Sequence, residues 1–567
     1  MEALSPQNNM QGTMGPNIRD GVPWRPTSLG PCRPRRSYDI LPGTWAGQFT
    51  LLEQNPSGPA LFIRNGLGPF ILASSISGYE PHRMFPLLCL TALLPFPLAS
   101  ADLTTTIAAK SNLGTWEGWG TSLAWWAQAF GTRDDLADIF FTLKTVPLSG
   151  VNTPSLPGLG FNIARYNAGA CSSNSINGTR MVVSPKMIPS RKMQGFWIDW
   201  ASSDVASASW DWSVDVAQRA MLTKARDRGA DVLELFSNSP MWWMCVNHNP
   251  SGADDGAKDN LQSWNQQQHA VYMAAVALQA DRKWGVKFQS VDAFNEPSAG
   301  WWSGKTGTQE GCHFDVKTQA IVIGHLRDAL DERGLNGVMV SASDESHYDQ
   351  AIDAFNGVGE KARGQIARVN VHGYQYAGGK RDKLFEIVSK AGKKLWQSEY
   401  GEGDATGKDM VSNMFLDFRW LKPTAWVYWQ VLDGGGWGLI DADNESKRIA
   451  GVNQKYFVLA QFARHIRPGM RMLDGGSDYT VAAYDAAAKK LVIVAVNWGN
   501  AQFLNFDLSK FGTPGVNGAV VKRWATQIGT SGTRYAEYGD TTLSGIKFWS
   551  KFEKNMVQTF EVSGVSL

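Results

Sequence analysis

Short apolar segments that end in polar side chains alternate with segments of helical periodicity through most of the chain. We expect eight strands, at residues 118–122, 161–167, 232–238, 288–294, 338–342, 369–374, 394–399 and 425–430. Helical periodicity fills several of the intervals, as at residues 214–228, 266–283 and 318–333, and these segments end in Gly or basic residues, which helix C-termini favour. An eightfold alternation of strand and helix predicts the α/β class and a closed (β/α)8 barrel, the TIM barrel.

The pattern changes near Gly469, where helical periodicity ends. Beyond this point short alternating runs are separated by Asp, Gly, Ser and Asn, which is typical of a β-sandwich. We therefore predict a barrel domain at residues 102–468, with a last helix at 455–466, and a C-terminal β-sandwich side domain at residues 469–567. The β-branched segment 102–107 is predicted to be an isolated strand, and a place in the sheet of the side domain is one option for it. No low-complexity linker separates the two parts, so we expect them to pack against each other.

Residues 84–101 have the features of a secretory signal peptide. An apolar run ends in Ala99-Ser100-Ala101, an A-x-A cleavage pattern, and the run is too short and too interrupted by proline to span a bilayer. We therefore expect a secreted, extracellular protein without a membrane span. Met84 is a natural start for such a precursor. Residues 1–83 lack a sustained helical or strand period, and we interpret them as a disordered or overcalled N-terminal extension.

The composition bears on the kind of partner. A net charge of +2 gives no indication of nucleic-acid binding, whereas 24 tryptophans would suit a groove that stacks on the apolar faces of sugar rings. We expect an oligosaccharide or polysaccharide partner and a monomeric protein. No metal-ligand spacing stands out, so we expect neither a metal nor a cofactor.

Three cysteines follow the expected cleavage point: Cys171, Cys245 and Cys312. In a secreted chain they allow one disulfide and one free thiol, and the sequence does not select the pair. Asn177 and Asn444 begin N-x-S/T sequons, so a secreted form is predicted to be a glycoprotein.

Two carboxylates follow apolar runs about a hundred residues apart: Glu296, within residues 295–297, and Glu399, within residues 398–400. Each would stand at the C-terminal end of a strand, where the side chains of a barrel converge on one cleft. Their separation corresponds to three βα units, which places them on the fourth and seventh strands. A distance of ~5 to 5.5 Å between the carboxyl groups would allow cleavage of a glycosidic bond with retention. The alternative is a surface carboxylate before a turn and a strand-end group with a structural partner.

The two carboxylates need different surroundings if they form a retaining pair. Glu399, as the nucleophile, must stay ionised, and Arg165 at the end of the second strand is the candidate cation that would lower its pKa. A structural ion pair is the alternative for an arginine at this place. Glu296, as the acid/base, must hold a proton and later accept one from water. Asn295 beside it can donate to the sugar 2-hydroxyl.

Further candidate substrate-binding residues lie next to other strand ends. We expect His372 and Tyr374, at the sixth strand, to hydrogen-bond the nucleophile or an axial hydroxyl. Trp429, on the eighth strand, would form the floor under the reacting sugar. Trp126 and Trp242 complete the predicted aromatic contacts with the ligand. A place in the hydrophobic core is the alternative for each of these side chains.

Resemblance to a known family rests on five motifs, at residues 118–126, 161–170, 236–244, 294–297 and 398–401. They resemble glycoside hydrolase family 30 and, within it, the fungal secreted endo-β-1,6-galactanases, and the likeness runs from about residue 102 to residue 567. It implies a retaining barrel with an attached side β-domain, in which Glu296 is the acid/base and Glu399 the nucleophile. It also implies cleavage of internal β-1,6-galactosidic linkages in the galactan side chains of arabinogalactan proteins. Alternatives are another β-glycosidase of the family, such as a β-1,6-glucanase, and a carbohydrate-binding protein without catalysis.

Overall fold

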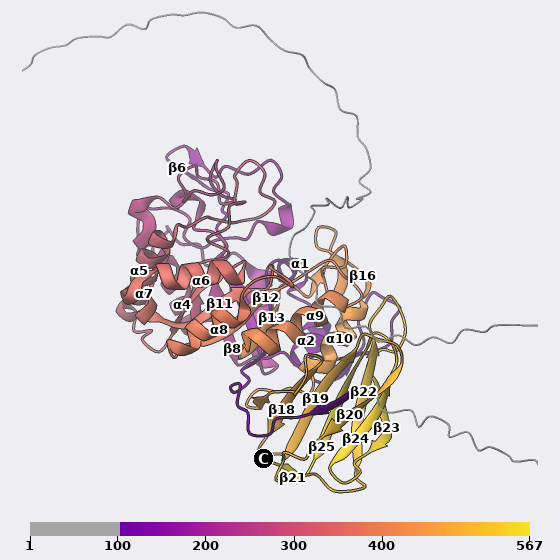
Figure 1. Ribbon diagram of the computed structural model, residues 1–567. Helices are drawn as coiled ribbons and strands as arrows, with labels where there is room; N and C mark the ends of the chain where they lie inside the picture. Colours follow the sequence, from indigo (N-terminus) through magenta and orange to yellow (C-terminus); the bar gives the residue numbers. More distant parts are fainter. Residues whose placement is uncertain (1–102) are drawn as a thin grey trace, which may run out of the picture. The chain divides into compact units, whose positions relative to one another are not determined.

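The computed structural model describes residues 103–567, and its central feature is a closed barrel of eight strands (Figure 1). The strands follow one another around the barrel in chain order: β2 (Gly118–Ser122), β5 (Ile163–Asn167), β8 (Val232–Phe236), β9 (Ser290–Asp292), β10 (Met339–Glu345), β11 (Ile366–His372), β12 (Lys394–Tyr400) and β13 (Ala425–Tyr428). All eight coincide with segments expected to be strands, so the predicted TIM barrel is confirmed. The expected signal peptide at residues 84–101 and the extension at residues 1–83 lie outside the described residues.

Helices connect most of the barrel strands. In chain order they are α1 (Trp126–Phe130), α2 (Asp134–Phe141), α3 (Val216–Asp227), α4 (Gln266–Gln279), α5 (Val316–Glu332), α6 (Tyr348–Gly357), α7 (Gly359–Gln365), α8 (Arg381–Lys390) and α9 (Lys408–Leu416). In α5, Val322, Leu326 and Leu330 recur every four residues and are fully buried, as an amphipathic helix on a core requires. Each such side chain contributes about 1.5–3 kcal/mol through its removal from water. The single turns η4 (Ala280–Trp284) and η5 (Asp417–Leu421) extend α4 and α9.

The interior of the barrel contains an apolar cluster and a set of buried polar groups. The apolar cluster joins Ile163, Trp396, Ala425 and Val427. The polar groups are charged or amide side chains that are almost completely buried: Arg165, Glu234, Asp292, Asp344, Arg368 and Asn370. Buried charges are tolerated only when they are paired, and these side chains pair with one another. The polar groups lie beneath the active-site cleft described below.

The side domain is a β-sandwich, seen as the orange and yellow strands of Figure 1. One sheet has the order β17 (Arg471–Leu473), β18 (Thr480–Asp485), β19 (Lys490–Asn497), β25 (Met556–Ser563), β22 (Val520–Gln527) and β23 (Ala536–Thr542). The other has the order β1 (Leu103–Thr106), β20 (Gln502–Asp507) and β24 (Lys547–Phe552). Phe506, Phe548 and Phe560 meet between the sheets, with ring centroids 4.9–5.2 Å apart. Leu103–Thr106 of the segment predicted as an isolated strand thus joins the side domain, because β1 pairs in parallel with β20.

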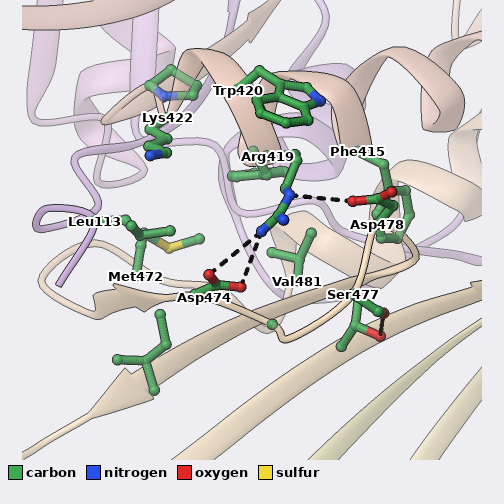
Figure 2. Close-up of a pocket in the computed structure, with 15 residues that line it drawn as sticks. Leu113, Phe415, Arg419, Trp420, Lys422, Met472, Asp474, Ser477, Asp478 and Val481 are labelled. Carbon is green, nitrogen blue, oxygen red and sulfur yellow. Dashed lines mark hydrogen bonds and ion pairs between the residues drawn. The ribbon is translucent and has the colours of Figure 1, made fainter. Parts of the chain in front are cut away.

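Barrel and sandwich pack directly on each other through the last helix, α10 (Gln454–Ala463), in which all ten residues are buried. Gln461 joins the sheet by two bonds: its amide donates to the Thr526 hydroxyl at 2.8 Å, and its backbone carbonyl accepts from the Thr559 hydroxyl at 2.7 Å. Figure 2 shows a second contact between barrel and sandwich, beside a cavity of about 210 Å³. There Arg419 of η5 forms ion pairs with Asp474 at 3.4 Å and Asp478 at 3.2 Å. None of the predicted site residues lines this cavity.

Several short strands were not predicted from the sequence. The most important is a small sheet of β14 (Leu432–Asp433), β15 (Ile440–Asp443) and β16 (Arg448–Val452), which follows the last barrel strand. The others are paired as β3 (Thr145–Val146) with β4 (Leu156–Pro157), β6 (Ser175–Ile176) with β7 (Thr179–Arg180), and β21 (Thr513–Pro514) with β26 (Val565–Ser566). In the part of the chain that the structure describes, no helix is long and apolar enough to cross a membrane.

The cysteines differ from the expectation of one disulfide. Within residues 103–567, Cys171, Cys245 and Cys312 are all free and buried. They lie on three different loops, after the second, third and fourth barrel strands. Burial raises the pKa of Cys245 to about 12 and that of the other two thiols well above the ordinary value, so all three are unreactive as thiolates.

Candidate active site

Glu296 and Glu399 come together in one cleft at the C-terminal ends of the barrel strands. Glu296 follows β9, the fourth strand of the barrel, and Glu399 lies near the end of β12, the seventh. A carboxylate oxygen of each lies within 4.8 Å of the other, and a nitrogen of His372 belongs to the same cluster. Both carboxylates line a cavity of about 620 Å³. This separation fits the ~5 to 5.5 Å of a retaining pair and is too small for the water that an inverting mechanism needs between its carboxyl groups.

The backbone of Glu296 is held in an unusual conformation. Its φ is +49°, in the left-handed region that residues with a Cβ rarely adopt. Two bonds fix it there: the Glu296 N–H donates to the Asp344 carbonyl at 2.7 Å, and the Trp302 indole donates to the Glu296 carbonyl at 2.9 Å. Such conformations persist only where the surroundings over-determine them, and they are concentrated at functional sites.

Glu399 is held at both oxygens by donors. Arg165 donates to Oε2 at 3.1 Å, and the Tyr374 hydroxyl donates to Oε1 at 2.9 Å. Burial raises the pKa of Glu399 above its ordinary value, and the charges of His372 and Arg165 offset part of the increase. The net direction is opposite to the expected lowering, because the cleft removes more water from this carboxylate than a strand end was expected to.

Arg165 lies below the cleft and is completely buried. Besides Glu399, its guanidinium bonds Glu234 at 3.0 Å and Asp344, and it packs 4.2 Å from the ring centroid of Phe236. The predicted support of the nucleophile by a cation therefore has a geometric basis. The structure gives no such basis for a direct contact between Arg165 and substrate, because Arg165 is not among the residues that line the cleft.

His372 joins the two cleft carboxylates from below. Its Nδ1 lies 3.1 Å from Glu296 and 3.4 Å from Glu399, and its Nε2 lies 3.4 Å from Asp344. Burial works against the imidazolium, yet the carboxylates of Glu399, Asp344 and Glu296 raise the pKa of His372 to about 10. At neutral pH this histidine is therefore a cation shared by three carboxylates. Like Arg165, it is fully buried and does not line the cleft.

Asp344 is a site residue that the sequence analysis missed. It lies in β10, contacts both Arg165 and His372, and accepts a 2.5 Å bond from the Ser398 hydroxyl. Burial opposes its charge, but Arg165 and His372 hold the pKa of Asp344 below the ordinary value. The run 343–346, Ser-Asp-Glu-Ser after an apolar strand, was the available signal.

The cleft walls contain three of the predicted substrate-binding residues, Asn295, Tyr374 and Trp429. The Asn295 side-chain oxygen is buried without a hydrogen-bond partner among residues 103–567, so it is available to a ligand. The walls also contain residues that were not predicted: Trp125, Arg191, Trp301, Trp302, Ser346, His347, Gln430, Asp433 and Trp437. Trp125 meets Trp429 edge-to-face with ring centroids 5.0 Å apart.

Trp126 and Trp242 lie in the core instead of the cleft. Both are fully buried and absent from the cleft lining. Trp126 begins α1, packs on Phe140 with centroids 5.6 Å apart, and donates to the Ser122 carbonyl at 2.8 Å. Trp242 donates to the Ser172 hydroxyl at 2.6 Å. The residue that reaches the cleft is Trp125, one position before Trp126.

Among residues 103–567, three clusters of carboxylate and histidine side chains are close enough together to hold a metal ion, but their ligand atoms have other partners. In the cluster of Glu296, His372 and Glu399, the histidine is protonated and would have to lose its proton before it could bind a metal. A second cluster, Glu402 with Asp404 and Asp409, is occupied by Lys455, whose ammonium lies 2.8 Å from Glu402. The third, Asp259 with His313 and Asp315, is bonded to backbone and to the Thr318 hydroxyl.

The comparisons agree with the geometry of the site. The family profile described as O-Glycosyl hydrolase family 30 matches residues 100–369. The chain is 58% identical over 469 residues to an Endo-beta-1,6-galactanase of Hypocrea rufa, which covers 83% of this chain and 96% of that protein. It is 23% identical to an Exo-beta-1,6-galactobiohydrolase of Bifidobacterium longum subsp. longum, over 59% of this chain and 27% of that protein. The catalytic domain of GH30 xylanase C from Talaromyces cellulolyticus has the same fold, with a TM-score of 0.60, 17% identity, and coverage of 81% and 100% of the two chains. The chain therefore belongs to glycoside hydrolase family 30, a family of retaining glycosidases.

Proposed function

We propose that this protein is an endo-acting hydrolase of the β-1,6-linked galactan side chains of arabinogalactan proteins, with Glu296 as acid/base and Glu399 as nucleophile. The observation that carries the proposal is the carboxylate pair, within 4.8 Å in a cleft of about 620 Å³. Support for the sugar and the linkage comes from the 58% identity to a fungal endo-β-1,6-galactanase over almost the whole of that protein. The proposal includes an extracellular location, which the expected signal peptide favours, and a monomeric state.

The reaction has two steps of the retaining type. In the first, Glu399 attacks the anomeric carbon, the bond from that carbon to the linking oxygen breaks, and Glu296 gives its proton to that oxygen. The product sugar leaves, and the remaining glycosyl group is bound to Glu399 as an ester. In the second, Glu296 takes a proton from water, the water oxygen attacks the anomeric carbon, and the bond to Glu399 breaks. Free enzyme is restored with Glu296 protonated.

The surroundings of each carboxylate suit these roles. Protonated His372 and Arg165 oppose the effect of burial on the pKa of Glu399 and so favour its ionised form. Bonds from Arg165 and Tyr374, one on each oxygen, fix its orientation. Asn295 and Trp429 also line the cleft. Asn295 provides an amide for a sugar hydroxyl, and Trp429 provides an aromatic surface for the sugar ring.

Two variants test the assignment on an aryl β-galactoside with a good leaving group. We expect Glu399→Gln to be almost inactive, because no nucleophile remains. Glu296→Ala should form the glycosyl ester and then stall, and added azide should restore turnover by attacking the ester without base assistance. Unchanged activity in either variant would contradict the assigned roles.

Product analysis tests the substrate. Chromatography of early digests of de-arabinosylated arabinogalactan should show β-1,6-galacto-oligosaccharides of several lengths, as endo action predicts. Cleavage of β-1,6-glucan in place of galactan would support the glucanase alternative. Binding of either polymer without any cleavage would support a carbohydrate-binding protein.

A further inference from the structure

Trp301 is a large aromatic side chain left half exposed at the edge of the cleft. It is 47% exposed, lines the cavity that contains both glutamates, and follows Glu296 on the same loop. Its ring centroid lies 6.1 Å from that of Trp302 and 6.1 Å from that of His347, which supply its only close aromatic neighbours among the described residues. An indole that is exposed on one side of a sugar-binding cleft is a surface for the apolar face of a sugar ring.

The loop that carries Trp301 is fixed at several points. Trp302 donates to the Glu296 carbonyl at 2.9 Å and packs so tightly on Gly311 that a Cβ there would lie 2.0 Å from its ring. Glu310, at the far end of the loop, is fully buried and accepts backbone N–H bonds from Ala170 at 3.0 Å and Met193 at 3.2 Å. The loop that carries Trp301 is therefore anchored next to Glu296.

The chemistry of the acid identifies the sugar that this position serves. Glu296 gives its proton to the linking oxygen, so the sugar beyond Glu296 is the one that leaves. The nucleophile side has an aromatic residue of its own. Trp437 lies against Gly401, where a Cβ would be 3.1 Å from the indole, two residues after Glu399. Both indoles line the cleft that contains the carboxylate pair: Trp301 lies on the loop that follows Glu296, and Trp437 packs beside the segment that follows Glu399.

We propose that Trp301 is the platform for the galactosyl unit on the leaving-group side and that it determines the preference for polymeric β-1,6-galactan over substrates without a sugar there. The inference rests on the proposed function and deepens it. A β-1,6 linkage ends in a primary alcohol, so the leaving ring has one more rotatable bond than in linkages to ring hydroxyls. Stacking on a fixed indole restricts that extra freedom and brings the linking oxygen to Glu296.

The same platform favours transfer to a sugar. After the first step a second galactosyl unit can bind on Trp301 with its 6-hydroxyl beside the ester. Glu296 then takes the proton of that hydroxyl, its oxygen attacks the anomeric carbon, and the bond to Glu399 breaks. The product is a new β-1,6 linkage in place of a hydrolysed one, and no further reactant is needed.

The test compares two substrates for three variants. The substrates are de-arabinosylated β-1,6-galactan, which fills both sides of the cleft, and an aryl β-1,6-galactobioside, whose phenol leaves the acid side without a sugar. For Trp301→Ala we expect the ratio of kcat/KM on galactan to kcat/KM on the aryl substrate to fall at least tenfold, and Trp301→Phe to restore most of it. Trp437→Ala should lower both rates and change the ratio less than threefold. Trp264→Ala is the matched control, because Trp264 is 72% exposed and does not line the cleft.

Further readouts separate a binding role from a structural one. With galactose added as acceptor, Trp301→Ala should form fewer transfer products per hydrolytic event than the wild type. An unchanged substrate ratio in Trp301→Ala would overturn the proposal, and so would a selective loss on galactan in Trp437→Ala, which would reverse the two sides. If the wild type cleaves another β-glycan and leaves galactan intact, the proposed substrate fails. The role of Trp301 is then tested by the ratio of kcat/KM on that glycan to kcat/KM on the corresponding aryl disaccharide.

Discussion

Replacing His372 by glutamine removes one positive charge from the group that joins the two cleft glutamates. Glutamine is close to histidine in size and can still donate a hydrogen bond, so the main change is electrostatic. His372 lies 3.1 Å from Glu296, 3.4 Å from Glu399 and 3.4 Å from Asp344. Glu399 and Asp344 also pair with Arg165, and the substitution supplies no new cation. The variant therefore tests whether the imidazolium is the group that allows these carboxylates to lie together.

The size of the effect follows from the pKa of His372, about 10 in the folded protein against the ordinary 6.5. Because the folded pKa is raised, the stabilisation is fully present below pH 6.5 and is lost as the pH rises through 10. Between these values the folded protein holds one proton more than the unfolded chain, so stability falls by about 1.4 kcal/mol per pH unit. The total is on the order of 5 kcal/mol, similar to the roughly 3–5 kcal/mol expected when one partner of a buried ion pair is removed.

Urea denaturation at pH 6, 8 and 10 measures this directly. We expect His372→Gln to be about 3–5 kcal/mol less stable than the wild type at pH 6, and the difference to shrink to about 1 kcal/mol or less at pH 10. The acidic limb of the pH profile of kcat/KM should also move to higher pH, because His372 opposes the effect of burial on the pKa of Glu399. A stability difference that is the same at all three pH values would refute the reasoning. It would mean that His372 stabilises the fold equally with and without its positive charge.

Two other consequences of the structure can be measured. Trp126→Phe should lower the free energy of unfolding by about 1–3 kcal/mol and change kcat/KM less than threefold, because Trp126 is buried in the core, whereas Trp125→Phe should lower kcat/KM and change stability less. If Trp126→Phe lowered kcat/KM and Trp125→Phe lowered stability instead, Trp126 and not Trp125 would line the cleft. The thiols of Cys171, Cys245 and Cys312 should escape iodoacetamide in the native protein and react after denaturation, as mass spectrometry of the peptides would show. A peptide pair linked through any two of them would contradict the structure.

The barrel could be predicted from the sequence because short, mainly apolar strand segments, buried on both faces, alternate with segments of helical periodicity. The position of each glutamate after such a run was enough to place the pair on the fourth and seventh strands. Edge elements of the sandwich give no such signal. In β23 (Ala536–Thr542) four consecutive residues are exposed, so neither an apolar run nor a clear alternation marks the strand.

Finer features of the site depend on registers that the sequence does not fix. Trp125 and Trp126 are equivalent in the sequence, but α1 begins at Trp126, and successive residues of a helix point about 100° apart. As a result Trp125 faces the cleft and Trp126 faces the core. Asp344 was missed for a related reason: the expected strand ended at residue 342, whereas β10 continues to Glu345 and brings this carboxylate to Arg165.

Buried carboxyl groups outnumber buried cations around the cleft. Three cations lie near six carboxyl groups, and these nine side chains are Arg165, Arg368, His372, Glu234, Asp292, Glu296, Asp344, Glu345 and Glu399. Burial, with the charges of Asp344 and Glu234, raises the pKa of Asp292 well above its ordinary value.

In the proposed mechanism the total charge of Glu296 and Glu399 stays constant through the catalytic cycle. In the first step Glu399 loses its charge by forming the ester, and Glu296 gains one by giving up its proton. The second step reverses both changes. The negative charge therefore moves from one carboxylate to the other, across less than 4.8 Å, and its total never changes. His372, at 3.4 Å from the first site of the charge and 3.1 Å from the second, can stabilise it in both positions without moving. A single fixed cation between the glutamates thus serves two steps that demand opposite charge states, which explains why the histidine lies below the pair and not beside either carboxylate alone.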